Sequence, residues 1–193
     1  MIRSFVALLL PEDLRERIAS TIEGLRPLGT AVAWVPPRNL HLTLQFLGNQ
    51  TEKRLAEAAD ALEEVGAGCA PLEVAFHGIG AFPGLERPRI LWIGVAQGGQ
   101  HARALQGRVA EALARRGFSP EARAWHPHLT IGRVFDDRRW RREAGPSLRA
   151  ALAQAATTSF GTVRVTEVAL MRSDLSPQGA RYSVRHLAAL SPT

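Results

Sequence analysis

Lysine and cysteine are almost missing from this chain. Only one of its 24 Lys and Arg residues is a lysine, Lys53, and Cys69 is the only cysteine. A single thiol excludes a disulfide framework and a cysteine-based metal cluster, and it fits the reducing cytoplasm, where we expect this protein. The excess of arginine is explained first by a coding bias, so it does not by itself indicate phosphate contacts.

Long apolar runs are absent as well. The apolar stretch near the N-terminus extends only from Phe5 to Leu10 before Pro11. This is too short for a secretion signal or a membrane span, so we expect neither. Of the 193 residues, 46% are hydrophobic and 22% are charged, which is typical of a folded domain or of two small lobes with a common interface. The formal charge of +6 favours a polyanionic partner, and RNA is the obvious candidate.

One pattern, His-Leu-Thr followed by an aliphatic residue, occurs twice, beginning at His41 and at His128. Both copies lie in apolar stretches that favour a β-strand, in which residues i and i+2 share a face. This places His41 beside Thr43 and His128 beside Thr130, while the intervening aliphatic side chains point into the core. The wide separation of the copies predicts one in each structural half, with the four polar side chains lining a shared cleft.

Imidazole and hydroxyl groups together suit phosphate chemistry. A neutral imidazole takes a proton from water, a protonated one gives a proton to a leaving oxygen, and a threonine hydroxyl donates to a non-bridging oxygen. A single histidine in a strand is more often structural, and threonine is a common strand residue. Two copies with matched apolar flanks are harder to explain by packing alone, so the four side chains form a candidate site.

Strands and helices alternate along the whole chain. Apolar patterning and the positions of Gly and Pro predict strands at residues 2–10, 31–35, 39–47, 72–82, 90–95, 129–134, 162–171 and 182–187. Helices are predicted at residues 11–25, 51–65, 100–116 and 147–156, with turns at 83–88 and 176–179. The second half begins at the 100–116 helix and follows an order similar to that of the first, which indicates an α+β fold of two related lobes.

Short segments outside the two motifs complete a recognisable pattern. In chain order they are residues 3–7 (RSFVA), 34–36 (WVP), 46–48 (FLG), 80–83 (GAFP) and 89–92 (RILW), followed by Arg133, Ser173 and Tyr182. Together with the two motifs, this ordered set resembles the two-histidine phosphoesterase superfamily. Within it, the chain is most similar to the RNA 2',3'-cyclic phosphodiesterases, historically called 2'-5' RNA ligases.

This resemblance implies a single bilobal domain over residues 1–193. Each lobe is expected to be a mainly antiparallel sheet with helices on its outer face, and the two lobes surround a central cleft that carries both motifs. The family pattern assigns His41 as the proton donor to the leaving 3'-oxygen and His128 as the proton acceptor that activates water, with no metal and no cofactor. The residues alone leave the reverse assignment of acid and base open.

The substrate implied by the family is RNA that ends in a 2',3'-cyclic phosphate, with tRNA fragments as one candidate source. Thr43 and Thr130 are expected to bind the non-bridging oxygens, and Arg133 is expected to neutralise charge or to hold the adjacent phosphate, although a surface arginine is a substantial alternative in so arginine-rich a chain. Hydrolysis leaves a 2'-phosphate. If an RNA 5'-hydroxyl replaces water, the same site joins the ends through a 2'-5' linkage without ATP. We expect a monomer.

Further candidates depend on position along the chain. Phe82 and Tyr182 are expected to border the cleft, and His126 departs from the family pattern but shares the catalytic face if the strand alternates from there. Trp34 and Trp92 are large enough to lie in the core or in the cleft wall, and the core is the favoured position for both. The arginine cluster, which has a tryptophan at its centre, is expected to contact the RNA backbone and consists of Arg138, Arg139, Arg141 and Arg142.

Three alternatives remain open. A metal site formed by His41, His126 and His128 has suitable residue types but no nearby acidic or cysteine partner. A non-catalytic RNA-binding module fits the net charge and the arginine cluster, with Trp140 stacking on a base, but two complete His-x-Thr pairs argue against it. A related phosphodiesterase that acts on small cyclic nucleotides or 2',5'-oligonucleotides keeps the chemistry and changes the substrate.

Overall fold

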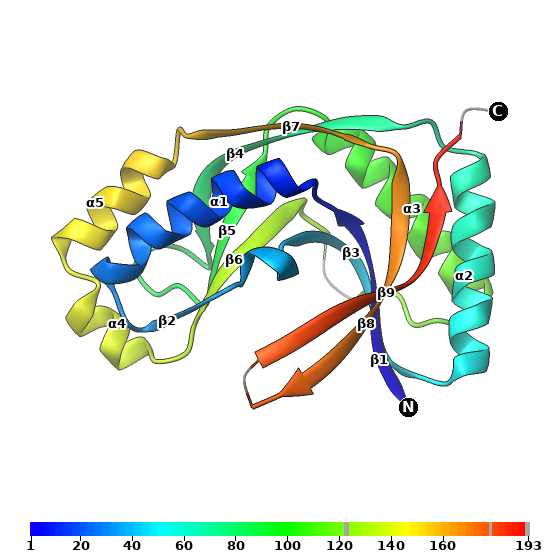
Figure 1. Ribbon diagram of the computed structural model, residues 1–193, viewed down its shortest axis with the longest axis horizontal. Helices are drawn as coiled ribbons and strands as arrows, with labels where there is room; N and C mark the ends of the chain where they lie inside the picture. The colour runs from blue at the N-terminus through cyan, green and yellow to red at the C-terminus, as the bar shows by residue number, and fades with distance from the viewer. Residues whose placement is uncertain (122–123, 178, 192–193) are drawn as a thin grey trace.

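A nine-stranded antiparallel sheet forms the centre of the molecule (Figure 1). The computed structural model describes residues 1–121, 124–177 and 179–191, and the strand order is β7-β4-β5-β6-β3-β1-β8-β9, with β2 paired to β6 beside that path. The strands are β1 (Ile2–Leu9), β2 (Val32–Trp34), β3 (His41–Gln50), β4 (Leu72–Phe82), β5 (Ile90–Val95), β6 (His128–Val134), β7 (Ser159–Val165), β8 (Glu167–Ser176) and β9 (Gly179–Ala189). The helices are α1 (Glu12–Leu25), α2 (Glu52–Ala67), α3 (Gly99–Arg115), α4 (Asp137–Glu143) and α5 (Pro146–Ala155), with short 3-10 turns η1 (Arg26–Leu28) and η2 (Pro37–Asn39).

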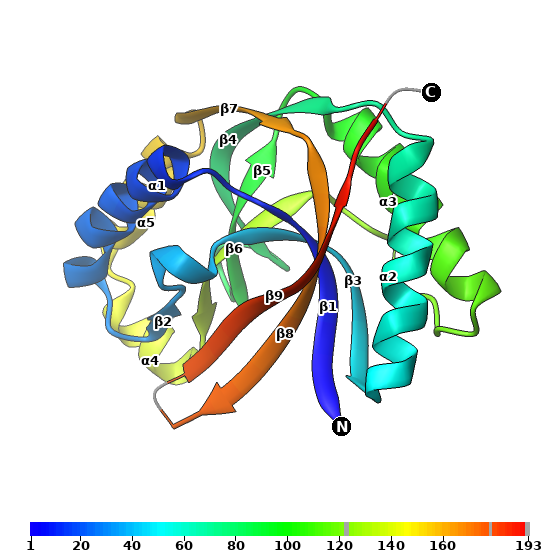
Figure 2. The same cartoon turned by 45° about the vertical axis from the view of Figure 1, so that its right-hand side comes forward.

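Helices cover the sheet in two places. In both views α2 and α3 lie together at one end of the sheet, and α1 and α5 lie at the other (Figures 1 and 2). On each of these four helices, apolar residues at helical spacing form one buried stripe. Residues of these stripes pack in a single core with the inward side chains of the strands, for example Leu14, Leu62, Leu113 and Leu152. In the described ranges no helix is both long and apolar enough to cross a membrane.

The opposite face of the sheet carries a second, smaller apolar cluster. Along β1, Val6 and Leu8 belong to the helix-covered core, whereas Phe5 and Ala7 pack with Ala169 and Met171 of β8. This alternation is expected of a strand that is buried on both faces. This opposite face therefore has an apolar floor of its own beside β3.

The eight strands of the path from β7 to β9 form two groups of four that meet between β3 and β6, and β2 is attached to β6 beside them. The group of the first motif contains β3, β1, β8 and β9, and the group of the second contains β6, β5, β4 and β7. The α+β fold with a mainly antiparallel sheet is confirmed, but the division at the 100–116 helix was wrong. β5 pairs with the second motif strand and β4 pairs with β5, so residues 72–95 belong to the second group, whereas residues 167–189 return to the first group, where β8 pairs with β1.

Two local predictions also differ from the structure. Residues 162–171 were expected to form one strand, but β7 ends at Val165 and β8 begins at Glu167, and these two strands lie in different groups. No helix was predicted for the arginine cluster, but it lies on helix α4, whose N-cap Asp136 accepts a hydrogen bond from the Arg139 backbone N–H at 2.9 Å. The predicted hairpin of β4 and β5 is confirmed, with Phe82 paired to Ile90.

Candidate active site

The two motif strands are direct neighbours in the sheet. β3 and β6 run antiparallel and pair at one position, where Leu42 lies opposite Leu129. Both leucines are fully buried in the main core, so the residues on either side of them point to the opposite face of the sheet. Continuing the register by one residue in each direction puts each motif histidine across from the threonine of the other motif.

This pairing gives the site a local two-fold relation. A rotation about an axis through the Leu42–Leu129 pair exchanges β3 with β6, and with them His41 with His128 and Thr43 with Thr130. The two imidazoles occupy diagonal corners of the square that they form with the two threonines. We call these four residues the His-x-Thr quartet.

Each motif strand contains a β-bulge directly after its threonine. On β3, Thr43 pairs with Ala7 and Gln45 with Val6, which leaves Leu44 as the extra residue. On β6, Thr130 pairs with Trp92 and Gly132 with Leu91, which leaves Ile131 as the extra residue. A bulge reverses the alternation of faces beyond it.

The bulges decide which side chains stand beyond the threonines on the face of the quartet. Without them the third residue after each threonine would point into the main core, whereas Arg133 and Phe46 are both exposed on the quartet's face. Phe46 packs against the ring of Phe5, which belongs to the apolar floor. The two strands therefore carry the same types of residue from the histidine to the bulge. They differ at the next position on the quartet's face, where β6 has the cation Arg133 and β3 has the aromatic ring of Phe46.

Backbone carbonyls orient both imidazoles. His41 Nδ1 lies 2.7 Å from the carbonyl oxygen of Asn39, and His128 Nδ1 lies 2.7 Å from that of His126. A carbonyl oxygen only accepts, so in each ring Nδ1 carries the hydrogen and Nε2 is left to accept or donate the reacting proton. This role of Asn39 was not predicted, although Asn39 precedes His41 by two residues just as His126 precedes His128.

Aromatic rings surround both histidines. The ring centroid of His41 is 4.7 Å from that of Phe5, and Tyr182 meets His41 edge-on at 5.2 Å. On the other side Phe82 meets His128 edge-on, also at 5.2 Å. The predicted positions of Phe82 and Tyr182 next to the site agree with these contacts.

Trp92 lies on the quartet's face rather than in the core. It pairs with Thr130, and its ring packs at 5.2 Å from the ring of Phe82. Gly80 makes this possible, because a Cβ there would lie 2.3 Å from the indole ring. The expectation of a core position was wrong for Trp92 and is confirmed for Trp34, which packs in the main core.

Burial and charge act in the same direction on both histidines. Burial lowers the pKa of His41 below its ordinary value, the hydrogen bond to Asn39 opposes this, and the positive charge of Arg133 lowers it further. Burial also lowers the pKa of His128, against the hydrogen bond to His126, and the charges of His126 and Arg133 add to the lowering. Since Arg133 influences both imidazoles, its guanidinium lies within electrostatic reach of both halves of the quartet.

The remaining groups of the site are free to bind an anion. Within the described ranges neither the Thr43 nor the Thr130 hydroxyl has a hydrogen-bond partner, and Arg133 has no ion pair. The backbone carbonyl of Thr43 accepts a 2.9 Å bond from Trp125 Nε1, which ties the segment before β6 to β3. In the described part of the chain no three His, Cys, Asp or Glu side chains gather closely enough to hold a metal ion.

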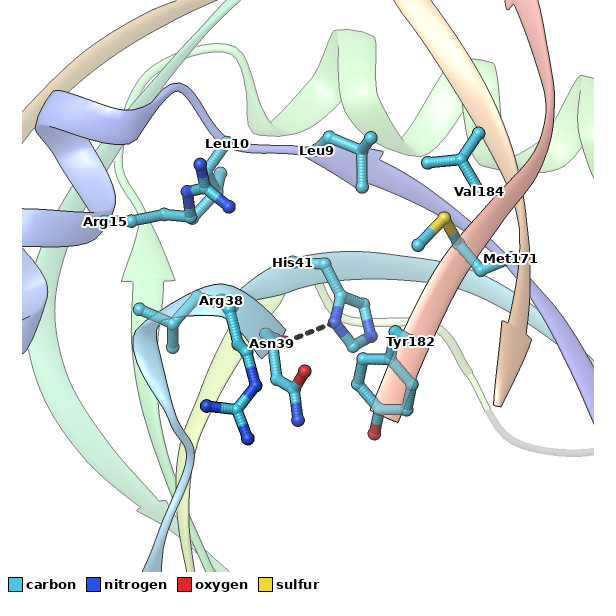
Figure 3. A pocket seen from close by; sticks show the side chains of 10 residues that line it. Leu9, Leu10, Arg15, Arg38, Asn39, His41, Met171, Tyr182 and Val184 are labelled. Atoms are coloured by element: carbon cyan, nitrogen blue, oxygen red, sulfur yellow. Dashed lines mark hydrogen bonds between the residues drawn. The ribbon is translucent and has the colours of Figure 1, made fainter. Parts of the chain in front are cut away.

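A cavity of about 240 Å³ opens on the His41 side of the quartet. In Figure 3 His41 lies between Arg15 and Arg38 on one side and Tyr182 with Met171 on the other. Residues of β1, α1, η2, β8 and β9 contribute to its wall, and His128 is not among the residues that line it. The two halves of the site are thus related by the two-fold axis at the quartet itself, but they differ in their surroundings, because this cavity adjoins His41 and not His128.

Comparison with known proteins agrees with this arrangement. A family model of the 2'-5' RNA ligase superfamily matches residues 11–177. The chain belongs to this superfamily. A superfamily relative from Aquifex aeolicus, named RNA 2',3'-cyclic phosphodiesterase, is 34% identical over 95% of this chain and 95% of its own. A protein of the same name from Methanothermobacter thermautotrophicus is 33% identical over 94% of this chain and 95% of its own. The crystal structure of TT0787 from Thermus thermophilus is 26% identical, covers 99% of both chains and has a TM-score of 0.77. The family resemblance drawn from the motifs is confirmed.

His126 contributes to the site through its backbone carbonyl and its charge, and not as a strand residue on the catalytic face. It precedes β6 instead of lying on it, and its side chain is exposed. Its backbone carbonyl accepts from His128, and its charge lowers the pKa of that residue. A metal site with His41 and His128 is not formed, since no such group exists among the described residues.

The arginine cluster lies outside the His41 cavity. None of its four members lines that cavity, and Arg141 forms an ion pair with Asp137 at 3.2 Å. Trp140 is fully buried in the main core, so it cannot stack on a base. The role of the four arginines in RNA binding stays a prediction, but the suggestion that Trp140 stacks on a base was wrong.

Proposed function

We propose that this protein is a metal-independent RNA 2',3'-cyclic phosphodiesterase that opens a terminal cyclic phosphate to a 2'-phosphate. The observation that carries this proposal is the two-fold relation of the His-x-Thr quartet. An in-line displacement at phosphorus has its entering and leaving oxygens on opposite sides, and two imidazoles at diagonal corners match that requirement. The names of the relatives support the same reaction for this chain.

The proton transfers follow from the free Nε2 atoms. Nε2 of His128 takes a proton from water as its oxygen attacks phosphorus, and protonated Nε2 of His41 gives a proton to the 3'-oxygen as the bond from phosphorus to that oxygen breaks. The products are a 2'-phosphate and a free 3'-hydroxyl. The assignment of acid to His41 and base to His128 rests on the family pattern and on the cavity beside His41, which has room for the nucleoside that carries the leaving oxygen.

The fixed charges and donors of the site stabilise the anion. The Thr43 and Thr130 hydroxyls donate to the non-bridging oxygens of the phosphate, and the guanidinium of Arg133 neutralises their negative charge. Because these groups are already in place on strands, they need little reorganisation when the charge on the oxygens changes.

The choice of nucleophile sets the outcome. An RNA 5'-hydroxyl in the place of water gives a 2'-5' linkage without ATP, since the strained cyclic phosphate supplies the energy. We assign the enzyme to the cytoplasm as a monomer, with RNA 3' ends such as those of tRNA fragments as substrate and no metal or other cofactor. A small cyclic nucleotide is the alternative substrate.

The test is an oligonucleotide with a terminal 2',3'-cyclic phosphate, incubated with the protein in EDTA, followed by mapping of the oxygen that keeps the phosphate. We expect a 2'-phosphate, and losses of roughly 100-fold or more in the variants His41→Ala and His128→Ala. His77→Ala is the matched control, because His77 lies exposed on β4 with no threonine two residues later. Full turnover in either motif variant, or loss of activity in EDTA alone, refutes the proposal.

A further inference from the structure

Two arginines line the His41 cavity without any acidic residue to balance them. Arg15 extends from α1 and Arg38 from η2, two elements that pack against each other. Among the residues that the structure describes, no carboxylate lines the cavity. Neighbouring arginines are paired with acids of α1, as Arg17 is with Asp13 at 2.9 Å and Arg26, the first residue of η1, with Glu23 at 2.9 Å.

Arg15 is the more unusual of the two. Its Nε atom is buried and has no hydrogen-bond partner among the described residues. An unpaired buried donor of a charged group costs free energy in the free protein, and a bound anion removes that cost. Figure 3 shows the Arg15 guanidinium beside Leu10, on the same side of the cavity as Arg38.

The position of the cavity indicates which part of an RNA chain reaches these arginines. In the proposed reaction His41 protonates an oxygen of the terminal ribose, so that ribose lies on the His41 side of the phosphate. The next charged group along the chain is the phosphodiester on the 5' side of this ribose. A path from the reacting phosphate past His41 into the cavity therefore ends at Arg15 and Arg38 (Figure 3).

We propose that Arg15 and Arg38 form a second phosphate subsite, which binds the phosphodiester on the 5' side of the terminal nucleotide. This inference rests on the proposed function, and it names a structural reason for acting on RNA ends rather than on free cyclic mononucleotides. Guanidinium groups suit the task, because their planar donors bind phosphate oxygens in pairs.

The rest of the cavity wall fits the uncharged part of a nucleotide. Leu9, Met171 and Val184 give an apolar surface, and Tyr182 offers a ring beside His41. The Asn39 amide is already engaged, since its Nδ2 donates to the backbone oxygen of Ala180 at 2.7 Å. Charged donors for an anion in this cavity therefore come from the two arginines, apart from the catalytic imidazole itself.

Three substrates that share one reacting group separate this subsite from the catalytic one. They are adenosine 2',3'-cyclic phosphate without a 5'-phosphate, the same compound with a 5'-phosphate, and the dinucleotide that ends in the same cyclic phosphate. We expect the double variant Arg15→Gln with Arg38→Gln to lose roughly 10-fold to 100-fold in kcat/KM on the second and third compounds. On the first compound its kcat/KM should stay near that of the wild type, which also shows that the variant is folded.

Two further variants make the comparison specific. Arg103→Gln with Arg164→Gln changes the net charge equally at two exposed arginines that lie outside the cavity, and it should leave all three rates unchanged. Arg15→Lys with Arg38→Lys keeps the charge but not the paired donors, and it should retain an intermediate rate on the dinucleotide. The salt dependence of kcat/KM for the dinucleotide should also become shallower in the glutamine variant.

The outcomes that overturn the subsite are distinct from failure of the function. An equal loss on all three compounds places the two arginines at the reacting phosphate, at the base or in folding, and an unchanged rate on all three removes them from binding altogether. Wild-type protein that hydrolyses none of the three refutes the proposed function instead.

Discussion

Replacing Arg133 with glutamine removes a positive charge that acts on both motif histidines while keeping a polar side chain of similar length. The bulge at Ile131 places this arginine on the quartet's face, and its charge lowers the pKa of His41 and that of His128. We therefore expect one substitution to change two separate properties, the affinity of the site for the transition state and the pH at which the site works.

The size of the first effect follows from the bonds that are lost. A hydrogen bond from a charged donor contributes roughly 1.5–3 kcal/mol, which corresponds to a reduction in kcat/KM of about 10-fold to 150-fold. The second effect has a definite sign. A nearby cation disfavours the imidazolium form, so its removal raises the pKa of each histidine and moves both limbs of the bell-shaped profile of kcat/KM to higher pH.

The assay combines rate profiles with direct titration. The kcat/KM of the oligonucleotide is measured across pH for the wild type, Arg133→Gln and Arg133→Lys, and the histidine ring protons are titrated by NMR in the same free proteins. The lysine variant should keep the wild-type pH optimum at a reduced rate, since the charge remains and the paired donors do not. Histidine titration curves that stay in place in the glutamine variant, or a full rate at the wild-type optimum, would refute this reasoning.

The remaining predictions concern the threonines and the arginine cluster. Thr43→Val and Thr130→Val should each lose roughly 10-fold to 1000-fold in turnover, and the serine variants should keep much more, because valine deletes the donor whereas serine keeps it; valine variants as active as wild type would show that the threonines only pack. Glutamine at all four positions of the arginine cluster should weaken binding of long RNA and flatten its salt dependence, with hydrolysis of a cyclic mononucleotide unchanged. An unaltered salt slope would leave the cluster as a solvated helix face.

Local periodicity was enough to predict the motif strands and their orientation. The rule that residues i and i+2 share a face puts the histidines and threonines opposite Leu42 and Leu129, and both leucines are fully buried. The hairpin that pairs Phe82 with Ile90 was equally visible, since its turn is marked by proline and glycine at residues 83–88. Such features depend on residues that are close in sequence.

Features that depend on distant pairing could not be predicted in this way. The residues next to Leu44 and Ile131 do not mark a bulge in the sequence, and each bulge forms because β1 or β5 pairs across it. For the same reason the exposed face of Arg133 looked like any surface position. The boundary between β7 and β8 was hidden, because an unbroken β-favouring run spans Thr166 while the two strands go to different neighbours.

Under the proposed mechanism, the two-fold rotation that relates β3 and β6 also approximately relates the protonation state of the protein before a turnover to the state after it. Hydrolysis begins with the proton on His41 and ends with it on His128, yet each ring keeps the same kind of carbonyl anchor throughout. Return to the starting form then requires only proton exchange with water, without movement of the backbone. The form left after hydrolysis also carries its acid and base in the order needed to close the ring again, so the protein that opens a cyclic phosphate is equally equipped to remake one.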